Sequence, residues 1–214
     1  PPQQEGVNVT MGYPLSGSAV YAVLKALSQV QLQMRRHGER WYFYHRSVRE
    51  VFSCSLFRQL LTPEETETVR RVTAEAKYYI PPEDLRIGPA LELFFHPVVT
   101  APETASAEAN RSIGAWLAEA TAWMGQAISS SPEMILELDF AKRCHTELTL
   151  LQEIDLDVRP STWFSTLDRL LQSISVPFRG EPLQGLQVMG PLETRALDFR
   201  HVIILSANEG SFPI

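Results

Sequence analysis

The sequence predicts an α/β domain built on a parallel sheet, with a large and mostly helical insertion. Strand and helix patterns alternate in residues 1–50 and 159–214, which is typical of a parallel sheet flanked by helices. Helix patterns dominate residues 51–158, where strand patterns nearly vanish. We therefore expect one α/β domain formed by residues 1–50 and 159–214, and a helical subdomain formed by residues 51–158.

The first 50 residues predict a β-α-β unit. Residues 7–11 alternate between apolar and polar like a short strand, and the Gly-Tyr-Pro at 12–14 favours a turn. Ser18 is a candidate N-cap of a helix, and Gly38 lies where that helix should end. The aromatic run 41–44 is strand-prone, so we expect it to pair in parallel with the first strand.

Helix signals mark the insertion. Thr62 is a candidate N-cap of a charged helix that begins at Pro63. Residues 107–128 predict a long Ala-rich helix, and a further helix is expected to begin at Pro132 and extend past Leu151. The proline-limited segments 78–82 and 94–97 predict extended connectors, because a residue before proline disfavours helical geometry.

The last third returns to an α/β pattern. Ser161 or Thr162 is expected to cap a helix, and residues 186–189 predict a short strand. The four aliphatic residues 202–205 predict a strand buried on both faces, as in a parallel sheet. Ligands gather at the carboxyl ends of parallel strands, so the polar residues 206–210 are a candidate site. The alternative is an ordinary polar loop in which Gly210 allows a tight turn.

Composition limits the classes of function. The net charge is −6, so any nucleic-acid contact must be local and cannot come from a basic surface overall. No apolar run reaches membrane-spanning length and no secretory pattern begins the chain, so we expect a cytoplasmic protein without membrane contact. Cys54 and Cys144 are expected to be ordinary thiols. The chain begins with Pro-Pro-Gln-Gln and has no initiator Met, and we interpret it as a piece of a larger protein.

Residues 192–213, LETRALDFRHVIILSANEGSFP, resemble motif V of the superfamily 1 helicases of the UvrD, RecB and AddB type. In that family the motif runs approximately His-Ser-x-Lys-Gly-Leu-Glu-Phe, then a valine-rich strand, then Glu-Gly-x-x-Pro. The matching positions here are Arg195, Leu197, Asp198, Phe199, Val202, Glu209, Gly210 and Pro213. Residues 7–15, VNVTMGYPL, and 178–199, FRGEPLQGLQVMGPLETRALDF, resemble the AddB-like proteins that bear a PD-(D/E)XK nuclease.

The resemblance implies the second RecA-like domain, with a P-loop NTPase-like parallel sheet and a helical insertion, of a bacterial helicase–exonuclease in DNA repair and recombination. It implies DNA and a helicase partner subunit as partners, with ATP and Mg²⁺ bound elsewhere in the parent protein. The residues that would face nucleotide or DNA are Glu193, Thr194, Arg195, Asp198, Asn208, Glu209 and Gly210, together with Gly12 and Tyr13 as counterparts of motif IV.

Departures from the motif indicate a degenerate motor. Glu193 stands where the family has serine, and its carboxylate would repel a phosphate. Arg195 keeps a cation at the lysine position and can still contact phosphate through two hydrogen bonds. We therefore expect this part of the parent protein to shape a DNA channel with weak DNA contact.

No catalytic set is found in the sequence. It has no G-x-x-x-x-G-K-[ST] loop to hold a nucleotide phosphate. A nuclease core needs an acid two residues before a lysine, and only Lys77, with Glu75, has one, in a helix-like stretch. We expect no catalytic residue, no metal site and no cofactor in this chain.

Two other functions are compatible with the sequence. One is a structural domain that docks a helicase partner without touching DNA, which exposure of Trp116, Trp123 or the proline-flanked aromatics would favour. The other is a free-standing nucleotide-binding α/β enzyme, against which the missing phosphate loop counts.

One aromatic and basic stretch allows two interpretations. The aromatic residues at 41, 42 and 44, followed by His45, Arg46 and Arg49, can form a platform on which bases stack and phosphates bind. The alternative, which we favour from the sequence, is a core strand with a solvated end.

Overall fold

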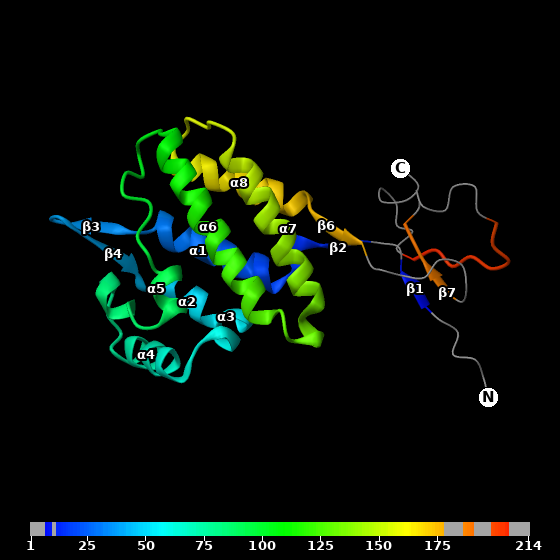
Figure 1. Ribbon diagram of the computed structural model, residues 1–214, viewed down its shortest axis with the longest axis horizontal. Helices are drawn as coiled ribbons and strands as arrows, with labels where there is room; N and C mark the ends of the chain where they lie inside the picture. Colours follow the sequence, from blue (N-terminus) through cyan, green and yellow to red (C-terminus); the bar gives the residue numbers. More distant parts are fainter. Residues whose placement is uncertain (1–6, 10–11, 178–185, 191–197, 206–214) are drawn as a thin grey trace. The chain divides into compact units, whose positions relative to one another are not determined.

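The computed structural model describes residues 7–9, 12–177, 186–190 and 198–205 (Figure 1). The chain divides into two compact units, one formed by residues 13–176 and the other by residues 1–12 and 177–214. The predicted parallel-sheet, RecA-like fold class is wrong, because the described residues are mostly helical and their strands form three small separate sheets. None of the described helices is long and apolar enough to span a lipid bilayer.

Helix α1 (Ala19–Leu32) is a central element of the 13–176 unit. Its predicted cap is confirmed, because the Ser18 hydroxyl accepts a hydrogen bond from the Tyr21 backbone at 3.0 Å. The Glu137 carboxylate adds two more acceptors, 3.0 Å from the backbone nitrogens of Ala19 and Val20. Two more of the four free N–H groups at this helix end therefore have a partner from a distant part of the chain.

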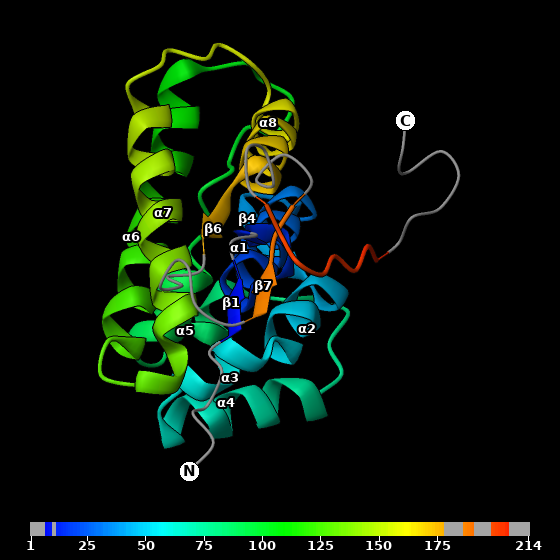
Figure 2. The same cartoon turned by 90° about the vertical axis from the view of Figure 1, so that its right-hand side faces the viewer.

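Further helices surround α1 and bury one core with it. They are α2 (His45–Ser53), α3 (Ser55–Leu60), α4 (Pro63–Ala74), α5 (Pro89–Phe94), α6 (Ala107–Ile128), α7 (Ile135–Gln152) and α8 (Pro160–Ser173), with short 3-10 helices η1 (Leu15–Gly17), η2 (Pro82–Leu85) and η3 (Pro132–Met134). The long pair α6 and α7 lies side by side in both views (Figures 1 and 2). The helices predicted from Pro63, over 107–128 and from Pro132 past Leu151 are confirmed. The extended connector predicted at 94–97 is wrong at Phe94, which ends α5.

A three-stranded antiparallel sheet replaces the predicted β-α-β unit. Strand β4 (Arg40–Tyr44) pairs with β3 (Arg35–His37) on one side and with β5 (Tyr79–Ile80) on the other. Helix α1 ends before these strands, and Gly38 lies in the two-residue turn between β3 and β4 with a φ of +61°. A turn this short can join only antiparallel strands, and with β3 and β5 on its two edges β4 has no edge left for a parallel partner.

The predicted turn at residues 12–14 is also wrong. These residues form strand β2 (Gly12–Pro14), which pairs with β6 (Ser175–Pro177). The backbone nitrogen of Leu15 continues the contact by donating a hydrogen bond to the Ile174 carbonyl at 2.9 Å. The two chain segments that bound the helical unit are therefore tied together where they meet.

The unit formed by residues 1–12 and 177–214 contains one parallel strand pair. Strand β1 (Val7–Val9) pairs with β7 (Leu186–Val188), with Asn8 opposite Gln187. The predicted buried strand at 202–205 is wrong, because these four side chains are 60–83% exposed and form no described strand. An apolar run favours burial, but the run itself does not show whether another element covers it, and no described element does so here. The two compact units meet at residues 12–13 and 176–177 and not at 50 and 159. The predicted division into an α/β domain and a helical subdomain stays a prediction.

Candidate nucleic-acid interface

Most of the motif V-like residues lie outside the described residues. These are Glu193, Thr194, Arg195, Asn208, Glu209 and Gly210. Asp198 is exposed and belongs to no helix or strand, and Gly12 is an exposed residue of β2. The Tyr13 ring lies 5.8 Å from that of Phe140, and its hydroxyl lies 3.5 Å from the Gly17 carbonyl. The DNA-facing and nucleotide-facing roles of these residues therefore stay predictions.

The acid and lysine pair at residues 75 and 77 forms part of a surface ion-pair network. The Lys77 ammonium lies 2.8 Å from the Glu75 carboxylate and 2.7 Å from that of Asp84, and these hydrogen bonds raise the pKa of Lys77. Among the residues that the structure describes, no group of three potential metal ligands is found. The pair fastens the end of α4 to η2.

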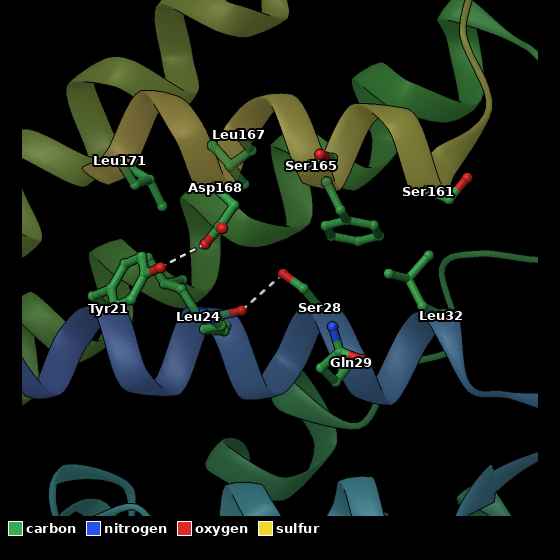
Figure 3. A pocket seen from close by; sticks show the side chains of 12 residues that line it. Tyr21, Leu24, Ser28, Gln29, Leu32, Ser161, Ser165, Leu167, Asp168 and Leu171 are labelled. Atoms are coloured by element: carbon green, nitrogen blue, oxygen red, sulfur yellow. Dashed lines mark hydrogen bonds between the residues drawn. The ribbon is translucent and has the colours of Figure 1, made fainter. Parts of the chain in front are cut away.

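A pocket of about 240 Å³ lies between α1 and α8 (Figure 3). The Tyr21 hydroxyl donates to the Asp168 carboxylate at 2.6 Å, and Gln172 donates to the same carboxylate at 2.7 Å. Burial, followed by the hydrogen bond to Asp168, raises the pKa of Tyr21. The polar groups at this end of the pocket are thus engaged with one another, and they hold α1 against α8.

The outer face of the β3–β4–β5 sheet gathers aromatic and basic side chains. Residues opposite each other in an antiparallel pair point to the same face, and neighbours along a strand alternate between faces. The pairs Arg35 with Tyr42, His37 with Arg40 and Tyr44 with Tyr79 therefore share one face. The opposite face supplies Phe43 and Ile80 to the core.

Six rings on and beside this face form a connected row, which we call the aromatic ladder: His37, Tyr42, Tyr44, His45, Tyr78 and Tyr79. The Tyr44 ring lies 5.3 Å from that of Tyr78, and the Tyr78 ring lies 5.0 Å from those of Tyr79 and His45. His37 joins the row at 5.8 Å from Tyr79 and 6.2 Å from Tyr42. Tyr78, whose ring contacts three others of the ladder, is 59% exposed.

The ladder is held in place by the backbone and by its hydroxyl groups. The His45 backbone nitrogen donates to the Tyr78 carbonyl at 3.2 Å, which fixes the segment before β5 against the end of β4. A hydrogen bond with Tyr78, followed by burial, raises the pKa of Tyr44. The Tyr44 phenol therefore stays neutral and adds no negative charge to the face.

Five arginines lie in residues 35–49: Arg35 and Arg40 share the face of the ladder, Arg46 and Arg49 follow on α2, and Arg36, opposite Trp41, lies on the other face of the sheet. All are exposed, and none takes part in the ion pairs found among the described residues. Arg46 lies close enough to Tyr44 for its charge to act on that phenol. Residues 35–49 contain five arginines and only one glutamate, in a chain whose net charge is −6. The face is therefore a local positive region on an acidic protein.

The structure confirms the core strand with a solvated end that the sequence favoured for residues 41–49, because β4 places Phe43 in the core with Trp41 packed against it, and Arg46 and Arg49 after it are exposed. Only Phe43 in the run 41–44 is fully buried, whereas Tyr42 and Tyr44 lie on the outer face. Sequence reasoning missed His37, Tyr78 and Tyr79, because they join the ladder only through the pairing of β3 and β5 with β4. The glycine between two short charged runs at 35–40 was the signal of the hairpin.

Comparisons of the chain with protein-family models, with curated protein sequences and with solved structures found no match. The functional interpretation therefore rests on the geometry of the outer sheet face and on the resemblance of the sequence to the AddB-like proteins.

Proposed function

We propose that this chain is a non-catalytic, DNA-binding part of a bacterial DNA-repair helicase–exonuclease of the AddB type. The observation that carries the proposal is the aromatic ladder together with four exposed arginines on or beside its face, Arg35, Arg40, Arg46 and Arg49, which take part in none of the ion pairs among the described residues. ATP hydrolysis, nuclease cleavage and their Mg²⁺ ions are then the work of other parts of the parent protein.

The charge distribution supports contact with phosphates. A protein that binds a nucleic-acid backbone uses arginine and lysine side chains that are free to replace its counterions. Surface arginines more often form ion pairs or face solvent singly, but here two share one sheet face and two more follow directly on α2. Figure 1 shows the β3–β4 hairpin projecting beyond the helices of its unit, where a long polymer has access to it.

The parallel strand pair supports the relation to the AddB-like proteins. The two stretches that resemble them, residues 7–15 and 178–199, are separated by most of the chain. Strand β1 belongs to the first stretch and β7 to the second, and the two strands pair in parallel. Segments that belong to one domain in that family thus pair in this chain, and in the sequence they come before and after the helical unit.

Fluorescence anisotropy with a labelled oligodeoxythymidine tests the proposal. The double variant Arg40→Gln/Arg46→Gln should bind more weakly, and its plot of log affinity against log salt should be less steep by about 1.4, or about 0.7 for each lost phosphate contact. The matched control is Arg143→Gln/Arg169→Gln, which removes two exposed arginines from α7 and α8 and lowers the net charge equally. Equal weakening in both double variants, or no binding by the unchanged protein at low salt, would contradict the proposal.

A second candidate function is docking of a helicase partner subunit without DNA contact. The exposed aliphatic run 202–205 and the exposed Tyr78 of a proline-flanked segment favour it, whereas Trp116, Phe94 and Phe95 do not, since they are buried. If this function is right, Ile203→Asp should leave the folded protein intact and abolish copurification of the coexpressed partner helicase subunit. Unchanged copurification would remove this candidate.

A further inference from the structure

We infer that the aromatic ladder stacks unpaired bases, so that this face selects single-stranded DNA over duplex DNA. The inference rests on the proposed function, because it assumes that the face binds DNA. It adds the class of DNA that is bound and assigns different roles to the rings and to the arginines.

The position of the rings is the first argument. A core strand needs apolar side chains on its inner face, and Phe43 and Ile80 supply them here. Tyr42, Tyr44 and Tyr79 lie on the other face, and Tyr78 beside them is 59% exposed. The ladder is thus an addition to the folded core and not a part of it.

The geometry of the rings is the second argument. The planes of Tyr44 and Tyr78 make an angle of 64°, those of Tyr78 and Tyr79 one of 81°, and those of Tyr44 and Tyr79 one of 49°. No two of these tyrosines are stacked in parallel; an edge-to-face contact covers one face of only one of the two rings and leaves the opposite face clear of that contact. A flat base can stack on such a face, whatever its sequence identity.

The placement of the charges is the third argument. Arg35 and Arg40 share the face of the sheet that carries the rings, and Arg46 and Arg49 lie on α2 directly after β4. A strand whose bases rest on the rings has its phosphates beside them, within reach of long guanidinium side chains. Bases within a duplex are already stacked on each other, so a duplex can use the arginines but not the rings.

The test compares three labelled probes of equal length on the whole chain: oligodeoxythymidine, an abasic oligonucleotide with the same phosphates, and a duplex. We expect the oligodeoxythymidine to bind at least about tenfold more tightly than the other two, since base stacking on an aromatic side chain contributes about fivefold to 150-fold for each base. Tyr78→Leu should remove about tenfold from oligodeoxythymidine binding and leave abasic binding unchanged. Tyr78→Phe keeps the ring and should bind like the unchanged protein.

The other outcomes separate base stacking, single-strand selectivity and the proposed function from one another. Equal binding of all three probes, with no effect of Tyr78→Leu, would overturn base stacking and leave the phosphate contact of the proposed function in place. Tighter binding of the duplex would overturn the single-strand selectivity. Absence of binding to every probe at low salt would overturn the proposed function together with this inference.

Discussion

Replacing the buried Glu65 with alanine should destabilise the protein more than replacing any of the exposed charged residues of α4. Although Glu65 lies in the first turn of a charged helix, its side chain is 0% exposed. One carboxylate oxygen accepts from the Thr62 backbone nitrogen at 2.8 Å, which completes a capping box on α4. The other accepts from the backbone nitrogens of Ala90 and Leu91, at 2.7 and 3.2 Å, and so caps α5 as well.

The size of the effect follows from the donors that lose their partner. A buried N–H group left without an acceptor costs about 1–3 kcal/mol, and Glu65→Ala leaves two of them at the start of α5. Loss of the capping interaction on α4 adds about 1 kcal/mol. The free energy of unfolding should therefore fall by at least about 3 kcal/mol.

Urea unfolding followed by circular dichroism measures this difference. The matched control is Glu64→Ala, which removes an exposed carboxylate from the same turn and should cost at most about 1 kcal/mol through the helix dipole. Glu65→Gln keeps the size of the side chain and one acceptor oxygen, so its loss should lie between the two. If Glu65→Ala is no less stable than Glu64→Ala, the double-capping role is wrong.

Three further predictions concern the same fold. Gly88→Ala should destabilise the protein by at least about 2 kcal/mol more than Gly38→Ala, as measured by thermal unfolding, because both glycines have positive φ but only at Gly88 would a Cβ meet a side chain, at 2.5 Å. Equal losses would contradict the close packing at Gly88. Burial raises the pKa of the Cys144 thiol to about 12, whereas an unfolded thiol ionises near about 8.5. Stability should therefore fall with rising pH between these values, by up to about 1.4 kcal/mol per pH unit, and urea titrations of Cys144→Ala should lack this part of the slope. Tyr21→Phe should cost about 1 kcal/mol in urea unfolding, since it removes the hydrogen bond to Asp168, and an unchanged midpoint would show that this bond does not hold α1 to α8.

Local signals in the sequence were sufficient for α4, α6 and α7, whereas the predicted cap of α8 at Ser161 or Thr162 is wrong, because that helix begins at Pro160 after Arg159. Thr62, Pro63 and Glu65 form a capping box that fixes where α4 begins, and Ser106 caps the helix predicted over 107–128. These signals act within a few residues, so a sequence pattern contains them completely. The role of Glu65 in capping α5 was not visible, because its partners lie 25 residues further along the chain.

The strands could not be predicted in the same way. An apolar or aromatic run shows that a segment favours extended structure, but its partner and direction depend on the chain between the strands. Residues 41–44 were assigned a parallel partner because the turn at Gly38 was taken for a helix end. The run 202–205 was assigned two covering layers, although the structure leaves it exposed.

Only part of the candidate site could be predicted from the sequence, for the same reason. Its tyrosines at 42 and 44 and its arginines at 46 and 49 are close in sequence and were recognised as a possible platform. Tyr78 and Tyr79 come from a segment more than thirty residues later, and they reach the platform only when β5 pairs with β4. Most of the motif V-like residues lie outside the described residues, so their role depends on the resemblance alone.

Photochemical crosslinking with an oligodeoxythymidine that carries 4-thiothymidine tests the DNA-binding face most directly, because it reports which residues touch the bases. Trypsin cuts after lysine and arginine, which releases the tyrosines of the ladder in two peptides, Trp41–Arg46 and Tyr78–Arg86. We expect the crosslinked nucleotide on these two peptides, with its yield reduced in Tyr78→Leu and retained in Tyr78→Phe. Crosslinks confined to peptides of α6, α7 or α8, with none on the two ladder peptides, would contradict the assignment of this face to single-stranded DNA.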